Sequence, residues 1–222
     1  MSTYKIQVVE IKERTHDTFS FVTTKPKDYQ FKPGQATELS ILKEGWEDEK
    51  RPFTFTSLPG GEHLEFTIKT YPSHEGVTNE LRKVKTGDSF EIGDAWGAIE
   101  YKGKGVFLAG GAGITPFIAI LRHLQREDNL AGHKLIFANK SPEDIILKDE
   151  LHTLLGENFI NILDDNGNTD HPEGRIDKDF LKKHISDFDQ HFYVCGPDKF
   201  NEAMIGYLKE LGANAESVVF EE

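Results

Sequence analysis

Apolar and polar residues alternate in several short runs along the first hundred positions. The alternation is clearest at residues 19–21, 64–68 and 90–92. A period of two is typical of a strand with one buried face. Turn sequences such as Lys32-Pro33-Gly34 separate these runs. Short strands at this spacing predict a small antiparallel β-barrel or sandwich over residues 1–102.

The pattern changes after residue 102. Mostly apolar runs at residues 106–109, 135–138 and 191–195 predict strands, and apolar side chains recur at helical spacing after the first and the last of them. A further helix is expected to begin near Ser141, with Ser141 as its N-cap and Pro142 at its first position. Alternating strands and helices with apolar strands predict a doubly wound parallel α/β sheet over residues 103–222.

Composition narrows the functional classes. The chain of 222 residues carries 26 Lys and Arg against 38 Asp and Glu, and its net charge of −12 argues against nucleic acid or an anionic membrane as partner. One cysteine excludes an intramolecular disulfide and a cysteine-ligated iron–sulfur cluster. No metal site is expected, because the nine histidines form no His-Glu-x-x-His motif. The lone thiol and an N-terminus without an apolar stretch predict a cytoplasmic protein with no membrane insertion.

A glycine-rich turn, Gly110-Gly111-Ala112-Gly113-Ile114-Thr115-Pro116, follows the apolar run at residues 106–109. Glycine lets the backbone approach a ligand closely, Pro116 suits the first helical position, and the free N–H groups of a helix start favour a phosphate. Open α/β sheets bind dinucleotides at this point. The alternative interpretation is an ordinary tight turn between a strand and a helix.

Three further segments carry candidate chemistry. Cys195-Gly196-Pro197 would place a thiol at the carboxyl edge of the sheet, or else a small buried side chain. Arg51-Pro52-Phe53-Thr54 offers an arginine fork, an aromatic face and a hydroxyl, or is an ordinary strand with an exposed arginine. Gly76-Val77-Thr78 has the character of a helix start open to an anion, or of a plain helix cap.

Taken in this order along the chain, the four segments resemble the motifs of the ferredoxin–NADP reductase superfamily of flavoproteins. Arg51-Pro52-Phe53-Thr54 is similar to the family's Arg-x-Tyr-Ser/Thr flavin motif, with Phe53 in place of tyrosine. Gly76-Val77-Thr78 is similar to its pyrophosphate-binding turn, and the other two segments resemble its nicotinamide motifs. The resemblance implies an FAD-binding antiparallel β-barrel over residues 1–102 and an NAD(P)-binding α/β domain over residues 103–222.

The resemblance also implies residue roles on the flavin side. Arg51 would pair with the flavin pyrophosphate, Phe53 would cover the isoalloxazine face, and Thr54 would donate a hydrogen bond toward flavin N5 and so act in catalysis. The pyrophosphate contact favours FAD over FMN. The implied flavin-binding set is Arg51, Pro52, Phe53, Thr54, Ile68, Lys69, Tyr71, Gly76, Val77 and Thr78.

On the nucleotide side, Cys195 would place its sulfur beside the nicotinamide, as a second catalytic residue. Asp144 would accept hydrogen bonds from the adenosine ribose. Residues 137–147 contain no arginine to bind a phosphate there, although Lys140 and Lys148 could partly serve, so NADH is expected over NADPH. The implied set is Gly111, Gly113, Thr115, Asp144, Cys195, Gly196 and Pro197. Near the end of the chain, Glu221 resembles the family's C-terminal carboxylate and is a candidate proton relay, the alternative being a solvated tail.

The function implied by this resemblance is transfer of hydride from NADH or NADPH to bound FAD. Electrons would then pass to a separate acceptor, because the chain ends at Glu222 with one cysteine. Ferredoxin or flavodoxin is the default protein acceptor, and a small molecule is an alternative. Two other hypotheses remain: a flavin-binding electron-transfer subunit or redox-sensing module within a larger complex, and a ferric-siderophore reductase. The sequence leaves the oligomeric state open.

Overall fold

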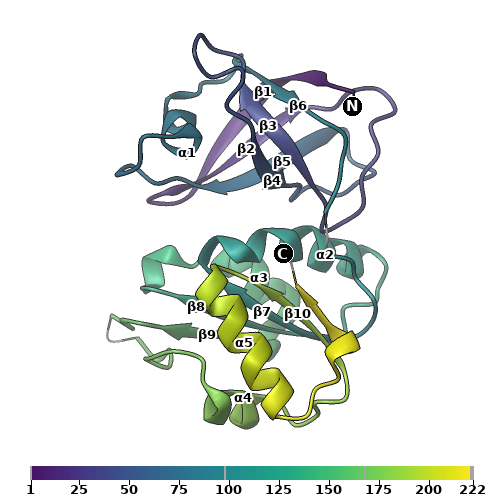
Figure 1. Cartoon of the computed structure of the whole chain (residues 1–222), viewed down its shortest axis with the longest axis vertical. Coiled ribbons are helices and arrows are strands. Elements are labelled where there is room, and N and C mark those ends of the chain that lie inside the picture. The colour runs from purple at the N-terminus through teal and green to yellow at the C-terminus, as the bar shows by residue number, and fades with distance from the viewer. Residues whose placement is uncertain (1, 98, 168, 221–222) are drawn as a thin grey trace.

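Two β-sheet units lie one above the other in the computed structural model, which describes residues 2–97, 99–167 and 169–220 (Figure 1). The N-terminal unit is a six-stranded antiparallel sheet with the order β4-β3-β6-β1-β2-β5. An isolated bridge between Phe55 and Phe66 joins its two edges and closes it into a barrel. Its strands are β1 (Tyr4–Thr15), β2 (Thr18–Thr24), β3 (Ala36–Ile41), β4 (Arg51–Thr54), β5 (His63–Lys69) and β6 (Ser89–Ile92).

The barrel core is built from the apolar positions of the alternating strands. Phe66 and Phe90 are both fully buried in one cluster, and Phe31 stacks on Phe55 with ring centroids 4.3 Å apart. The short helix α1 (Val77–Glu80) and the following turn η1 (Leu81–Lys83) add Val77 to this core. The predicted antiparallel barrel is confirmed.

The C-terminal unit is a five-stranded parallel sheet with the order β11-β10-β7-β8-β9. Side chains of successive residues alternate between two cores, so that Phe107 enters one cluster and Leu108 the other. Burial on both faces explains why the strand sequences are almost wholly apolar. The strands are β7 (Gly105–Gly110), β8 (Lys134–Asn139), β9 (Phe159–Leu163), β10 (His191–Cys195) and β11 (Val218–Phe220).

Helices cover both faces of this sheet. Helices α2 (Thr115–Arg126) and α3 (Lys148–Leu155) pack on the face that holds Phe107, and α4 (Lys178–His184) and α5 (Asp198–Glu210) pack on the opposite face. Helix α2 lies between the parallel sheet and the barrel (Figure 1). The predicted doubly wound α/β architecture is therefore confirmed. The remaining short turns are η2 (Gly111–Ile114), η3 (Pro142–Asp144), η4 (Gly156–Asn158) and η5 (Ala215–Ser217).

The segment after β8 differs from the prediction. Ser141 and Pro142 begin only the single turn η3, and α3 starts at Lys148 after Leu147, whose φ of 53° is left-handed. The Ser141 hydroxyl donates to the Asp144 carboxylate and caps no backbone N–H, so the expected helix start at Ser141 is wrong. Pro116 likewise stands one position later than predicted, because α2 begins at Thr115.

Within the described part of the chain, no helix has both the length and the apolar character required to cross a bilayer.

Candidate functional site

The glycine-rich turn after β7 packs directly on the end of β10. A Cβ at Gly113 would lie 2.1 Å from the carbonyl oxygen of Cys195 and 2.6 Å from the backbone nitrogen of Gly196, so that only glycine fits. The strands themselves are neighbours, with Ala109 paired to Cys195. Two segments singled out separately in the sequence thus form one site at the carboxyl edge of the parallel sheet, where such folds bind ligands.

Phe200 is a third component of this site that sequence reasoning did not single out. Its ring lies 3.1 Å from the Cβ position of Gly110 and 2.6 Å from that of Gly196. Helix α5 begins directly after Pro197 and delivers this ring. The available signal was an aromatic residue four positions after Gly196, which was interpreted only as part of an apolar helix stripe.

The glycine-rich turn after β7 leaves its backbone open at Gly111. Gly111 has a left-handed φ of 52°, and no atom lies within 4 Å of its Cβ position. Thr115 donates its hydroxyl to the carbonyl of Ala112 and so fixes the turn at the start of α2. Cys195 is buried beside it. Open glycine backbone at a helix start suits a pyrophosphate, so these residues fit a dinucleotide.

Strand β4 presents the arginine and the hydroxyl of the first flavin-like motif. Arg51 is exposed and donates to the Glu49 carboxylate at 3.1 Å and to the Lys50 carbonyl at 2.7 Å. Phe53 and Thr54 are half-buried, and Thr54 pairs with Ala36 of β3. A strand rises by about 3.3 Å per residue, so the arginine and the threonine backbones stand roughly 10 Å apart.

The segment from the end of β5 to α1 carries the second flavin-like motif. The Ile68 side chain lies in the barrel core, and the residue pairs with Phe19 of β2. Tyr71 is 41% exposed and stacks on His74 with centroids 5.5 Å apart. At Gly76 no atom lies within 4 Å of the Cβ position, and α1 begins at Val77. First-turn N–H groups such as those of Val77 and Thr78 have no acceptor within the helix.

Lys69 and Asp144, both candidates from sequence, bind each other across the two units. The Lys69 ammonium lies 3.0 Å from the Asp144 carboxylate and 3.1 Å from that of Asp17 in the turn between β1 and β2. Burial alone would raise the pKa of Asp144, but the hydrogen bond and charge of Lys69 outweigh it and hold that pKa below its ordinary value. The same carboxylates raise the pKa of Lys69 despite its burial. Both groups stay charged at neutral pH.

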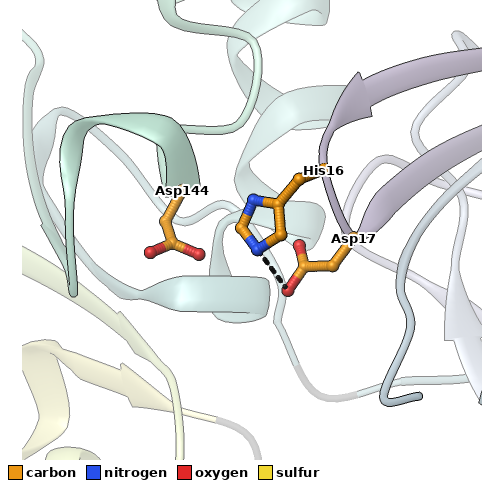
Figure 2. A group of neighbouring side chains, drawn as sticks. All are labelled: His16, Asp17 and Asp144. Atoms are coloured by element: carbon orange, nitrogen blue, oxygen red, sulfur yellow. Dashed lines mark ion pairs between the residues drawn. The ribbon is translucent and has the colours of Figure 1, made fainter.

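His16 completes this group from the barrel side. Figure 2 shows His16 beside Asp17, with Asp144 approaching from the other unit. The His16 ring nitrogen is 3.6 Å from the Asp17 carboxylate, and ligand atoms of all three residues lie within 4.8 Å of one another. This is the one group among the described residues with the donors for a metal ion. Lys69 already supplies a cation to both carboxylates, so the arrangement does not require a metal.

Arg122 of α2 makes a second set of contacts between the units. Its guanidinium binds both oxygens of Glu150 in α3, at 2.5 and 2.9 Å, and one oxygen of Glu65 in β5 at 2.7 Å. It also donates to the carbonyl of Thr56 at 2.6 Å. Burial would raise the pKa of Glu65, but Arg122 and the Thr56 hydroxyl lower it below its ordinary value. Sequence reasoning did not identify this cluster, because Glu65 and Arg122 lie 57 positions apart.

The last candidate, Glu221, lies outside the described residues, and its role stays a prediction.

Comparison with known proteins follows the same division of the chain. Residues 2–101 match the FAD-binding domain family, and residues 107–205 match the oxidoreductase NAD-binding domain family. The chain belongs to the ferredoxin–NADP reductase superfamily. Its barrel is accordingly an FAD-binding domain, and its parallel sheet forms an NAD-binding domain.

Individual members of the superfamily are distant relatives. The uncharacterized oxidoreductase AIM33 of Saccharomyces cerevisiae is 30% identical over 73% of this chain and 56% of its own length. The reductase component of propane 2-monooxygenase from Rhodococcus jostii is 26% identical over 98% of this chain and 62% of its own length. The chain thus spans about three fifths of these two curated relatives.

A solved structure extends the likeness to the whole fold. The ferredoxin NADP⁺ reductase of Neisseria gonorrhoeae, described with bound FAD and NADP, superimposes with a TM-score of 0.85 at 21% identity. The match covers 99% of this chain and 98% of that one. Similarity at this level of identity shows a shared fold, a barrel followed by a doubly wound sheet.

Proposed function

We propose that the chain is an FAD-dependent NAD(P)H oxidoreductase that delivers electrons to a separate acceptor. The observation that carries the proposal is the pairing of an FAD-binding with an NAD-binding domain, joined by direct ion pairs between β5 of the barrel and the elements of the α/β unit. Bound there, FAD would supply the redox chemistry that takes up hydride from a reduced nicotinamide and passes electrons to an acceptor. The chain's own residues supply binding, alignment and electrostatics.

For the flavin, the proposal assigns the exposed Arg51 to the pyrophosphate, where its planar fork binds phosphate oxygens in pairs. Phe53 would cover one ring face, and the Thr54 hydroxyl would donate toward N5. Tyr71 adds an exposed aromatic surface, and the open backbone from Gly76 supplies N–H donors. Such pyrophosphate contacts favour FAD over FMN.

For the nucleotide, the proposal assigns the glycine turn at the start of α2 to the pyrophosphate. The backbone of Gly111 is open there, and Gly113 lets the turn pack closely on the end of β10. Thr115 fixes this turn through its bond to Ala112. Cys195 would lie beside the nicotinamide, because Gly113 packs on its carbonyl group. Exclusion of water at this buried thiol helps to keep the transferred hydride from side reactions.

The preference for NADH over NADPH is also proposed. Asp144 keeps its negative charge because Lys69 lowers the pKa of its carboxyl group. A carboxylate near the adenosine ribose accepts hydrogen bonds from hydroxyls and repels an added phosphate. Residues 137–147 contain no arginine to compensate.

The acceptor is proposed to lie outside these 222 residues, because they hold a single cysteine and therefore no cysteine-ligated iron–sulfur cluster. The net charge of −12 slows encounter with acidic carriers such as ferredoxin or flavodoxin. A subunit role in a larger complex is the second candidate, favoured by the relative that is the reductase component of propane 2-monooxygenase.

Anaerobic titration with NADH and NADPH tests the proposal. The purified protein is expected to be yellow, with flavin absorbance near ~450 nm, and to bleach with one equivalent of NADH per flavin. NADPH should bleach it more slowly. A protein that holds flavin but is reduced by neither nucleotide would contradict the oxidoreductase assignment.

A further inference from the structure

Strand β5 has two functions in the fold because its two faces differ. Leu64, Phe66 and Ile68 point into the barrel core. Glu65 and Lys69, four residues apart and therefore on the same outer face, contact the α/β unit. The two charges on this face are opposite in sign, and each forms an ion pair with a side chain of the α/β unit: Glu65 with Arg122, and Lys69 with Asp144.

At the first contact, Glu65 meets Arg122. Only 13% of the Glu65 side chain and 20% of the Arg122 side chain are exposed. The Arg122 guanidinium donates two parallel hydrogen bonds to the Glu150 carboxylate. This bidentate geometry fixes the orientation of the guanidinium as well as its distance from Glu150. Arg14 of β1 lies 3.6 Å from the other oxygen of Glu65, so the two arginines balance the two glutamates.

At the second contact, the Lys69 ammonium bridges Asp17 of the barrel and Asp144 of the α/β unit. The Lys69, Asp17 and Asp144 side chains are 15%, 14% and 10% exposed, so solvent and salt screen their attraction weakly. The Ser141 hydroxyl donates to the second oxygen of Asp144 and fixes its orientation.

We propose that these two contacts form an electrostatic clamp that sets the orientation of the flavin-binding barrel on the nucleotide-binding unit, with Arg122 as its central positioning residue. The inference rests on the proposed function for its consequence in hydride transfer. The barrel supplies the negative charge at the first contact and the positive charge at the second, so the clamp favours one orientation of the two units. A domain arrangement rotated by half a turn would set Glu65 against Asp144 and Lys69 against Arg122, which are like charges and repel.

Arg122 is connected to both the flavin half and the nucleotide half of the proposed site by short segments of regular structure. Arg122 binds the carbonyl of Thr56, two residues beyond Thr54. In the other direction, Arg122 lies two helical turns after Thr115 on the same unbroken helix α2. Arg122 therefore joins the strand assigned to the flavin ring with the turn assigned to the nucleotide. A misplacement of 1 Å between reacting groups costs roughly 10²-fold in rate.

The test compares Arg122→Met with Arg126→Met. Arg126 is an exposed arginine one turn later on the same helix, and it lies beside Gly60 of the barrel but forms no ion pair with a described carboxylate. Arg122→Met should keep its flavin but lower the rate of flavin reduction at saturating NADH by 10-fold or more. The long-wavelength absorbance that a stacked nicotinamide and flavin produce should weaken in parallel. Arg126→Met should match the parent protein in both measurements.

A second readout is independent of the reaction. Without nucleotide, amide hydrogen exchange at β5 and at the end of α2 should be faster in Arg122→Met than in the parent protein and in Arg126→Met. Arg122→Met combined with Glu65→Gln removes the pair without leaving a buried carboxylate, and it serves the same test if the single variant fails to fold.

Unchanged exchange and an unchanged reduction rate in either folded Arg122 variant would overturn the clamp. A parent protein that neither nucleotide reduces would instead overturn the proposed function, while the exchange experiment would still report on the clamp. Faster exchange with an unchanged reduction rate would also overturn the positioning role, because Arg122 would then only stabilise the fold.

Discussion

Gly113 and Cys195, 82 positions apart in the sequence, are in backbone contact, and a Cβ on the glycine would stand 2.1 Å from the cysteine carbonyl oxygen. The contact joins the turn after β7 to the end of β10 at the edge of the parallel sheet. It makes the proposed nucleotide site a single unit, because neither segment can move without the other.

Gly113→Ala is therefore expected to damage nucleotide binding. The added methyl group forces the turn away from β10, so KM for NADH should rise by 10-fold or more while FAD content stays unchanged. Steady-state kinetics and flavin absorbance check this. Gly206→Ala is the control: it lies inside α5 with no atom within 4 Å of its Cβ position, and it should stabilise the fold by about 0.5–1 kcal/mol. An unaltered KM in Gly113→Ala would argue against the site.

Arg51→Ala should weaken flavin retention by several-fold or more, because it removes the charged fork proposed to bind the pyrophosphate. Dialysis followed by absorbance near ~450 nm measures the loss. Glu49→Gln is a matched control, since it removes only the carboxylate that pairs with Arg51 at 3.1 Å. That variant should retain flavin at least as well as the parent protein. Equal retention in Arg51→Ala would exclude the assigned role.

Acid should weaken the ion pairs that join the barrel to the α/β unit. The pKa values of Glu65 and Asp144 are lowered in the folded protein from their ordinary values of 4.5 and 3.8. Their stabilising contribution is therefore present above those values and is lost as pH falls through the lower folded values. Lys69, Asp17 and His16 face Asp144, and Arg122 and Arg14 face Glu65. Hydrogen exchange at β5, after correction for the intrinsic pH dependence, should rise below pH about 4 and stay flat from pH 6 to 9.

Chelation should leave the protein unaffected. The Lys69 ammonium lies between Asp17 and Asp144 in the group that has metal-binding donors and attracts both, so no ion is needed to hold the carboxylates together. Treatment with EDTA is expected to change neither the melting temperature nor flavin reduction. Lys69→Met removes that ammonium, and Zn²⁺ should then raise the melting temperature of this variant but not that of the parent. A melting temperature that falls on chelation in the parent would show that an ion contributes.

The local pattern of apolar residues and glycines was sufficient to predict the architecture and the turns, but not the contacts between the barrel and the α/β unit. The alternation around Phe66 and the glycines near Gly113 reflect constraints within a few residues, so a single sequence reveals them. Strand β9 was not predicted, because Asn161 interrupts its apolar run. Pairs such as Lys69 with Asp144 join positions 75 residues apart and leave no periodic trace. Asp144 was consequently predicted to be an acidic residue near the nucleotide, without its partner Lys69.

The clamp has a consequence for how the two halves depend on their covalent linkage. If side chains on β5, α2 and the segment before α3 set the alignment, then the peptide connecting β6 to β7 need not set it. Within this peptide Trp96 pairs with Ala36 and Ile99 is buried in the α/β core, and beyond these packed positions it serves as a tether. Lengthening that tether by a few flexible residues should cost only a few tenths of a kcal/mol in closure entropy. Under the same logic, the barrel and the parallel sheet produced as two separate polypeptides would be expected to reassemble in the native orientation.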